Sequence, residues 1–248
     1  MVSRDAFPAL CIERLAKAYG RSRVLDGVDL QVRPGETVAL VGTNGAGKTT
    51  LLKCVLDLIL PEEGRIEIFG VPNRDPRSRS RVAFLPERFS PPHYLLGREF
   101  LEMTLALGGG RFDRRHAARQ LEELELAPEV LDRPARELSK GTTQKLGLAA
   151  SFLAERDLYV FDEPLDGLDA TARLAVKRAL VRLQRAGRAV LFTSHVLADV
   201  EEVCTSLVVL DRGVIRFHAP PSELCARYGD ENLERAFVKC VRDAHAQS

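Results

Sequence analysis

Residues 42–49 read Gly-Thr-Asn-Gly-Ala-Gly-Lys-Thr, which is the G-x-x-x-x-G-K-T pattern of a phosphate-binding loop. The apolar run 37–41 before it contains β-branched residues and predicts a strand. Apolar residues on one face of a predicted helix follow the loop: Leu51, Leu52, Val55, Leu56 and Ile59. A strand, a glycine-rich loop and a helix in this order are the context in which this short pattern indicates a phosphate-binding site. The glycines let backbone N–H groups turn inward around phosphate oxygens, and the helix start adds the positive end of its dipole.

The residues of this loop have separate predicted tasks. Lys48 would reach the β- and γ-phosphates of a nucleoside triphosphate and assist catalysis, and the Thr49 hydroxyl would ligate Mg²⁺. The predicted nucleotide-binding residues are Gly42, Thr43, Asn44, Gly45, Ala46, Gly47, Lys48, Thr49 and Thr50. The alternative is a glycine-rich turn without a ligand, which the Gly-Lys-Thr spacing and the flanking elements argue against.

The composition argues against several other classes of protein. The 248 residues are 45% hydrophobic and 29% charged, which is ordinary for a globular chain with a full core. A formal net charge of +1 gives no electrostatic reason to expect a nucleic-acid partner. The arginines within 111–119 are followed by Glu122, Glu123 and Glu125, so this stretch is typical of a solvated helix face.

We expect no disulfide framework, secretion signal or membrane span. The five cysteines are odd in number and form no C-x-x-C pair, which fits a reducing compartment. Residues 1–10 lack the continuous apolar core of a signal peptide. The longest apolar run, 51–60, is interrupted by Lys53 and Asp57 and is too short to cross a bilayer. A role at a membrane would therefore need another polypeptide to span it.

The order of the predicted elements indicates an α/β fold. Strands are expected at residues 10–16, 28–32, 64–70, 82–85, 158–161, 189–192, 207–210 and 214–217, with a loop at 73–81. Helical spacing dominates 97–153, and another helix is expected at 171–185. The crossover of roughly 25 residues around that helix indicates a parallel, doubly wound sheet. The predicted fold is a P-loop NTPase core with a mostly parallel sheet, an N-terminal antiparallel β region and an inserted helical subdomain.

Two acids end the apolar strand predicted at 158–161. Ligands of open α/β sheets bind at the carboxyl ends of strands. Asp162 would belong to the Mg²⁺ shell, and Glu163 would act as the base that deprotonates a water attacking the γ-phosphate. An acidic loop without function is the alternative, but hydrolysis requires both a phosphate loop and such acids, so the two motifs support each other.

Residues 138–146 read Leu-Ser-Lys-Gly-Thr-Thr-Gln-Lys-Leu. Alone, Ser139 would be a helix N-cap. Together with the other motifs, this stretch resembles the L-S-G-G-Q signature of ABC (ATP-binding cassette) ATPases. The resemblance covers nearly the whole chain, with the motifs in family order. It implies an ABC ATPase domain at residues 8–222, with a core at 8–87 and 155–222 and a helical subdomain at about 88–154. A short helical tail would occupy 223–248.

The resemblance also implies roles for individual residues. Tyr19 matches the aromatic residue that stacks on adenine, although simple packing is its alternative. Glu87 falls at the Q-loop position and would contact Mg²⁺. His195 matches the switch histidine, against the alternative of a polar loop residue, and would be catalytic with Glu163 and Lys48. The remaining nucleotide-contacting positions are Ser139, Lys140, Gly141 and Thr142 of the signature and Asp169 of the D-loop.

Three positions depart from the family pattern. Glu87 replaces a glutamine and adds negative charge near the predicted magnesium. Lys140 replaces a glycine of the signature and would attract a γ-phosphate if it points inward. Thr142 replaces the signature glutamine and is too short to make every contact of that residue.

The resemblance implies that two copies pack head to tail with two ATP molecules between them. Each ATP would touch the phosphate loop of one copy and the signature of the other. The strings Leu85-Pro86-Glu87, 97–101 and Ser139-Lys140-Gly141 look like those of bacterial export-type ATPase subunits. The expected function is therefore ATP hydrolysis that powers transport, with export favoured, through an integral membrane subunit. The expected location is the cytoplasmic face of a bacterial inner or plasma membrane.

Two other functions fit parts of the sequence. A soluble ABC ATPase that acts on ribosomes or DNA would usually carry two cassettes or long coiled-coil arms, and this chain has one phosphate loop and no long heptad run. A regulatory subunit that binds ATP and barely hydrolyses it would not need Glu163 and His195.

Overall fold

The computed structural model describes residues 7–246, which form two sheets and a set of surrounding helices. The strands are β1 (Leu10–Tyr19), β2 (Ser22–Val32), β3 (Thr37–Val41), β4 (Glu63–Ile68), β5 (Val71–Pro72), β6 (Val82–Leu85), β7 (Leu158–Phe161), β8 (Ala189–Thr193), β9 (Ser206–Asp211) and β10 (Val214–Ala219). The α-helices are α1 (Lys48–Val55), α2 (Pro76–Arg79), α3 (Gly97–Leu107), α4 (Arg114–Glu123), α5 (Lys140–Leu153), α6 (Ala170–Arg185), α7 (Leu197–Val203), α8 (Pro221–Tyr228) and α9 (Leu233–Ala246). Short 3₁₀ helices cover Pro128–Asp132 and Ala135–Glu137.

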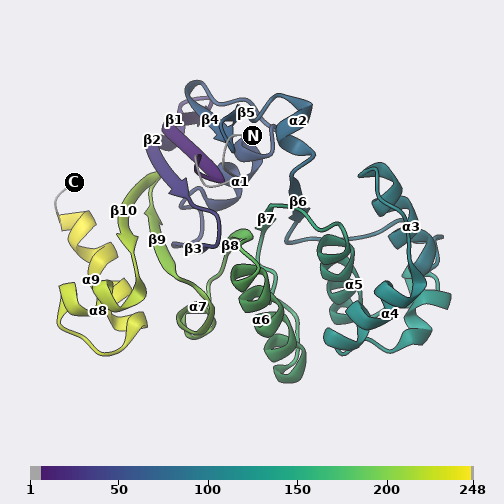
Figure 1. Cartoon of the computed structure of the whole chain (residues 1–248). Helices are drawn as coiled ribbons and strands as arrows, with labels where there is room; N and C mark the ends of the chain where they lie inside the picture. The colour runs from purple at the N-terminus through teal and green to yellow at the C-terminus, as the bar shows by residue number, and fades with distance from the viewer. Residues whose placement is uncertain (1–6, 247–248) are drawn as a thin grey trace.

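The larger sheet has the strand order β10-β9-β3-β8-β7-β6 (Figure 1). Strands β9, β3, β8, β7 and β6 run parallel, and only β10 is antiparallel to its neighbour among the paired strands of this sheet. Every residue of β3, β7 and β8 is buried, as expected for parallel strands covered on both faces. The predicted mostly parallel, doubly wound sheet is confirmed.

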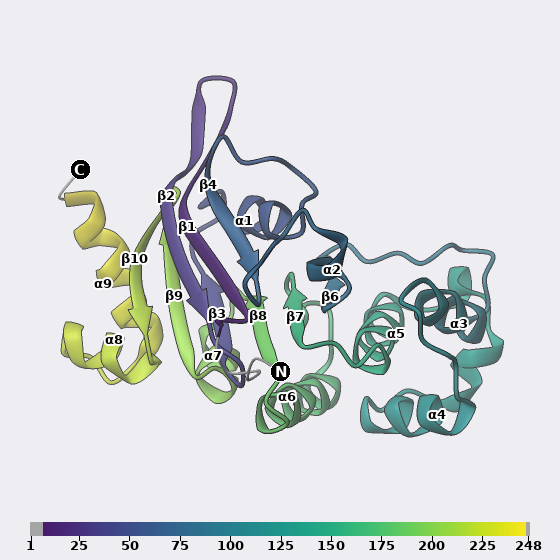
Figure 2. The same cartoon turned by 45° about the horizontal axis from the view of Figure 1, so that its top comes forward.

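The smaller sheet has the order β2-β1-β4-β5 and is antiparallel throughout its named pairs. Figure 2 shows it lying over one face of the larger sheet, with α1 beside it. Apolar side chains from both sheets and α1 form one buried cluster between them. The predicted N-terminal antiparallel region is therefore present and shares a core with the nucleotide-binding strands.

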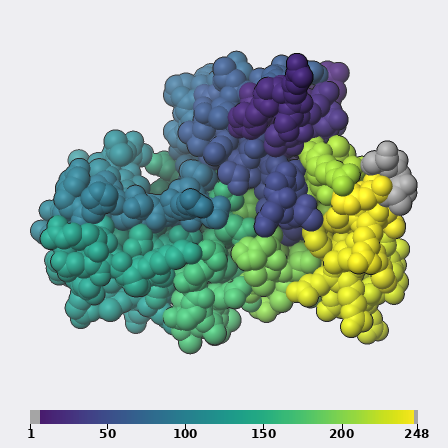
Figure 3. Space-filling model, turned by 180° about the vertical axis from the view of Figure 1, so that it is seen from behind, coloured from purple at the N-terminus to yellow at the C-terminus, as the bar shows by residue number. Residues whose placement is uncertain are grey.

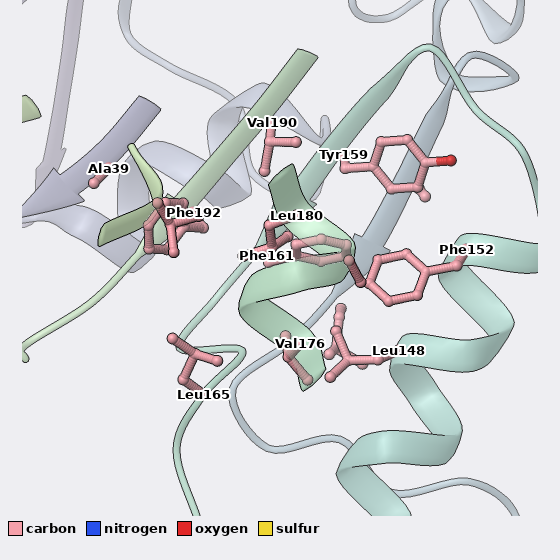
Figure 4. Packing of buried hydrophobic residues seen from close by; sticks show 14 of the residues in the cluster. Ala39, Leu148, Phe152, Tyr159, Phe161, Leu165, Val176, Leu180, Val190 and Phe192 are labelled. Atoms are coloured by element: carbon pink, nitrogen blue, oxygen red, sulfur yellow. The ribbon is translucent and has the colours of Figure 1, made fainter. Parts of the chain in front are cut away.

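Helices α3, α4 and α5 form a block beyond the β6 edge of the larger sheet, between β6 and β7 in the sequence (Figures 1 and 2). A second buried cluster joins this block to the sheet and to α6. At its centre the rings of Phe152, Tyr159 and Phe161 lie 5.9–6.3 Å apart between centroids, in tilted and edge-on orientations (Figure 4). The helical block is therefore packed firmly onto the sheet through α5.

Helices α8 and α9 form the C-terminal tail, which packs beside β9 and β10 at the opposite end of the molecule from the helical block (Figures 1 and 3). The tail buries Leu224, Leu233, Ala236 and Cys240 in the same cluster that runs under the larger sheet. None of the helices within residues 7–246 combines the length and the apolar character needed to cross a membrane.

Two local predictions were wrong, and one helix was missed. Helix α1 ends at Val55 rather than continuing through Ile59, because the chain turns at Asp57, whose φ of 57° is left-handed. The predicted loop at 73–81 contains α2, which Asp75 caps by accepting a hydrogen bond from the Arg77 N–H. Helix α7 was not predicted, since its seven residues carry too short an apolar pattern to stand out.

Replacing Phe161 by alanine is expected to lower the free energy of unfolding by about 3–5 kcal/mol. The side chain is fully buried within the aromatic cluster, and its removal leaves a cavity that rigid strands on both sides cannot fill. Urea unfolding followed by circular dichroism measures the change. Leu107→Ala is the matched control, because Leu107 is 83% exposed and its loss should change stability by less than about 0.5 kcal/mol. Equal losses in the two variants would contradict this view of the core.

Candidate functional site

A cavity of about 630 Å³ lies where β3, β7 and β8 end. Its lining residues are Val24, Asn44, Gly45, Ala46, Gly47, Lys48, Thr49, Thr50, Glu87, Asp162, Glu163, Asp166 and His195. Strand pairing brings these segments together from positions more than 150 residues apart in the chain. The phosphate loop, the acid pair, Glu87 and His195 were all predicted as site residues, whereas Val24 and Asp166 were not.

The glycines of the phosphate loop are required for different reasons. A Cβ on Gly42 would lie 2.2 Å from the Leu210 carbonyl oxygen, so the loop can leave β3 only where no side chain is present. Gly47 has a φ of 109°, and a Cβ there would lie 2.8 Å from the Val24 carbonyl oxygen. A Cβ on Gly45 would meet nothing within 4 Å. Glycine is favoured there because the φ of 79° is left-handed, a conformation that other residues rarely adopt. These positions fix a loop whose amides can surround an anion.

Lys48 is the first residue of α1, and its ammonium is held by the loop itself. Its Nζ donates hydrogen bonds to the carbonyl oxygens of Gly42 at 2.8 Å and Thr43 at 3.3 Å. Burial lowers the pKa of Lys48, while the carboxylates of Glu163, Asp162 and Glu87 act in the opposite direction. A positive charge at this point, surrounded by weak carbonyl acceptors, is well placed to bind phosphate oxygens.

Asp162 is held by two hydroxyls from two different elements. The Thr49 hydroxyl donates to Asp162 Oδ2 at 3.2 Å, and the Thr193 hydroxyl donates to Asp162 Oδ1 at 2.7 Å. Thr193 Oγ1 also accepts a hydrogen bond from the Glu163 N–H at 2.8 Å. The sequence interpretation missed Thr193, because Asp162 and Glu163 are 31 and 30 residues away in the chain and come next to it only through the pairing of β7 with β8.

The donor set at Thr49 and Asp162 fits a magnesium ion. Mg²⁺ takes oxygen ligands and usually binds one or two protein groups, with water and phosphate oxygens completing its shell. The Thr49 hydroxyl and the Asp162 carboxylate provide such oxygens, and Glu87 lies on the wall of the same cavity. Among residues 7–246 there is no group of three or more His, Cys, Asp or Glu side chains that could hold a metal ion.

Glu163 and His195 both line the cavity and contact each other. Glu163 Oε2 lies 2.9 Å from His195 Nδ1. Burial raises the pKa of Glu163, and the neighbouring His195 and Lys48 act to lower it. Glu163 also has a left-handed φ of 52°, which turns the chain sharply after Asp162. A carboxylate that is partly desolvated accepts a proton more readily, as a general base must.

The other predicted site residues lie outside this cavity. Tyr19 ends β1, is 51% exposed, and has the Lys17 ammonium 5.5 Å from its ring centroid. Ser139 caps α5 by accepting a hydrogen bond from the Thr142 N–H at 3.1 Å, and their hydroxyl oxygens are 2.8 Å apart. Asp169 caps α6 by accepting a hydrogen bond from the Ala172 N–H.

The two central residues of the predicted signature contact the loop between β7 and α6. Lys140 Nζ donates a hydrogen bond to Asp166 Oδ2 at 2.8 Å. A Cβ added to Gly141 would lie 3.2 Å from the Gly167 carbonyl oxygen, so α5 begins directly against this loop. Within one chain, the signature residues therefore do not reach the phosphate loop's cavity.

The chain resembles known proteins along most of its length. Residues 25–166 match the family model described as ABC transporter. The chain is 32% identical over 240 residues to the ABC-type transporter ATP-binding protein EcsA of Bacillus subtilis, covering 94% of this chain and 97% of that protein. It is 33% identical over 220 residues to Nod factor export ATP-binding protein I of Ralstonia nicotianae, covering 88% and 68%. It is 36% identical over 236 residues to a putative peptide import ATP-binding protein of Brucella ovis, covering 89% and 74%.

A solved structure described as the ATP binding subunit of an ABC transporter has the same fold. The TM-score is 0.82 at 30% sequence identity, over 94% of this chain and 99% of that one. Some relatives are longer, and the chain spans 57% and 54% of two ABC transporter ATP-binding proteins from Nostoc and Synechocystis. The likeness confirms the predicted fold class.

Thr193→Val is expected to lower the free energy of unfolding by about 1–3 kcal/mol. The substitution keeps the volume of the side chain but leaves Asp162 Oδ1 and the Glu163 N–H without the hydroxyl that joins them. Urea unfolding measures the loss. Thr104→Val is the control, because the Thr104 hydroxyl donates to the Phe100 carbonyl one turn earlier within α3, away from the site. A loss in Thr193→Val no larger than in the control would refute the role of this hydroxyl.

The Glu163 carboxyl is expected to titrate above 4.5, the ordinary glutamate value, because burial favours its neutral form. Carbon NMR of the side-chain carboxyl measures the midpoint, and the signal lost in Glu163→Gln identifies it. The raised pKa means that the folded chain binds this proton more tightly than the unfolded chain. Stability from this group therefore declines as pH rises from the unfolded value through the folded one. Glu13, whose pKa is lowered by its hydrogen bond to Arg65, is the internal control.

Proposed function

The chain belongs to the family of ABC transporter ATP-binding subunits, and on this premise we propose that it hydrolyses ATP to drive transport through a separate integral membrane subunit. The main support for hydrolysis is the single cavity that the phosphate loop, Asp162 and the Glu163–His195 pair share. Binding of ATP alone would not require a buried carboxylate beside a histidine at this point. A regulatory subunit without hydrolysis therefore fits the site less well.

Each residue has a defined part in the proposed reaction. Glu163 accepts a proton from the attacking water, and His195 holds the Glu163 carboxylate in position through their 2.9 Å contact. Lys48 stabilises the negative charge that develops on the phosphate oxygens. Thr49 and Asp162 would hold Mg²⁺, with Glu87 nearby, and the ion would neutralise charge on the bound phosphates.

We propose that two copies enclose two ATP molecules in a head-to-tail dimer. The signature residues Ser139–Thr142 and the D-loop residue Asp169 lie outside the chain's own cavity, so a second copy is needed to bring them to a nucleotide. Tyr19 would stack on the adenine. Each chain has one phosphate loop and one signature, and a homodimer therefore completes both sites. Hydrolysis removes the shared terminal phosphate, which lets the copies part.

The dimer would act on a membrane subunit at the cytoplasmic face of a bacterial inner or plasma membrane. Substrate selection would belong to that subunit. Export is favoured by the strings Leu85-Pro86-Glu87 and Ser139-Lys140-Gly141 and by similarity to a protein named for Nod factor export. Another similar protein is named for peptide import, so the names of the relatives include both directions of transport.

Glu163→Gln is expected to slow ATP hydrolysis by roughly 10²- to 10⁴-fold, the usual contribution of a general base. It is also expected to form a dimer with ATP and Mg²⁺ on size exclusion, because the shared phosphate is no longer removed. Phosphate release and the elution volume measure the two effects.

Two variants control this experiment. Adding Lys48→Ala to Glu163→Gln should abolish the dimer, since the phosphate loop then lacks its cation. Glu122→Gln, on the exposed face of α4, should leave turnover and elution unchanged. A Glu163→Gln chain that remains monomeric with saturating ATP, or that turns over at the normal rate, would overturn the proposed function.

A further inference from the structure

An ion pair joins the helical block to the loop that follows the catalytic acids. Lys140 is the first residue of α5, and its Nζ donates to Asp166 Oδ2 at 2.8 Å. The lysine stem lies over Gly167, where an added Cβ would come within 3.1–3.3 Å of Lys140 Cε, Nζ and Cδ. The glycine therefore allows the stem to lie flat against the loop, and the ammonium is directed to one carboxylate.

Asp166 lies between two cavities. Its backbone N–H donates to the Glu163 carbonyl oxygen at 3.1 Å, which fixes the turn after the proposed base. Asp166 lines the cavity of the phosphate loop together with Glu163 and His195. It also lines a second cavity of about 570 Å³, which Glu87, Lys140 and Thr143 help to form. Asp166 is therefore in reach of both the chain's own site and the first turn of α5.

Lys140 lies at a position of the predicted signature, so formation of the proposed dimer would affect the Lys140–Asp166 ion pair. The ABC signature that this stretch resembles has a glycine at this position. This chain instead has a cation at the N-terminal end of α5, which would face the partner's nucleotide. A terminal phosphate carries more negative charge than one carboxylate and offers more acceptor oxygens. The Lys140 and Asp166 side chains are 73% and 40% exposed, so their pair is weak enough to be exchanged.

We propose that Lys140 exchanges its counter-ion when the dimer forms. In the separate chain Asp166 holds the ammonium, and in the dimer the terminal phosphate bound to the other copy replaces Asp166. This inference rests on the proposed function, because it needs the head-to-tail dimer. Its consequence is that the two partners of one ion pair act in opposite directions: Asp166 opposes dimerisation and Lys140 favours it.

The test is the dissociation constant of the ATP-bound dimer, measured by sedimentation velocity in the Glu163→Gln chain with ATP and Mg²⁺. Asp166→Asn frees the ammonium and should lower this constant, whereas Lys140→Met should raise it. An exposed pair changes an equilibrium by roughly 1.5- to 5-fold, and each dimer breaks two pairs. The expected effect of Asp166→Asn is therefore about 2- to 25-fold.

The double variant separates counter-ion exchange from simple repulsion between Asp166 and a nearby nucleotide. If exchange is correct, adding Asp166→Asn to Lys140→Met changes nothing, because no ammonium is left to release. If Asp166 merely repels phosphate, the same addition still tightens the dimer, and exchange is overturned.

Glu123→Gln is the matched control. It breaks the 2.6 Å ion pair between Glu123 and Arg182, which joins the helical block to α6 and lies outside both cavities. The dissociation constant should stay within about twofold of the parent. If Asp166→Asn and Lys140→Met change the dissociation constant in the same direction, the ion pair only stabilises the fold. That result would overturn the counter-ion exchange and leave the proposed function standing. Failure of the parent Glu163→Gln chain to dimerise would overturn the proposed function and the exchange together.

Discussion

The parallel pairing of β3, β8 and β7 brings the functional side chains of the site to the same edge of the larger sheet. Leu40 pairs with Thr193, and Phe161 pairs with Phe192, so the three strands end beside one another. The phosphate loop leaves the end of β3, the acid pair leaves β7, and His195 follows β8. Thr193 closes this arrangement with one hydroxyl, which donates to Asp162 and accepts from the Glu163 N–H. A change of register in any of these strands would separate the groups.

Two adjacent carboxylates acquire different chemistry from this arrangement. Asp162 accepts hydrogen bonds from the hydroxyls of Thr49 and Thr193, which fix its carboxylate oxygens beside the phosphate loop. Glu163 turns away through a left-handed backbone and meets His195, while burial raises its pKa. Neighbouring acids with different surroundings can thus serve as a metal ligand and a general base. The backbone turn at Glu163 is what directs the two side chains apart.

Much of this site could be predicted from the sequence, because its groups occur in contiguous motifs. The phosphate loop, Asp162, Glu163 and His195 stand directly after apolar strand patterns, and the order of strands and helices indicated the doubly wound sheet. Thr193 could not be assigned a role, because its partners, Asp162 and Glu163, follow the neighbouring strand β7 and are about 30 residues away in the chain. Asp166 was missed for a similar reason, since Lys140 is 26 residues away and belongs to the helical block. Helices α2 and α7 are too short for their periodicity to be distinct.

In the proposed dimer, the position of the predicted signature would let ATP link two copies. In one chain, Ser139 and Asp169 serve as helix caps, and Lys140 is paired with Asp166, so each of these polar groups already has a local partner. Such groups remain stable in the separate chain and do not require a ligand. A phosphate presented by a second copy would compete for groups that are only weakly held, since the Lys140–Asp166 pair is exposed. Under the proposed exchange, Lys140 of each chain would leave Asp166 only when that phosphate is present, so association would depend on the nucleotide rather than on a permanent apolar interface.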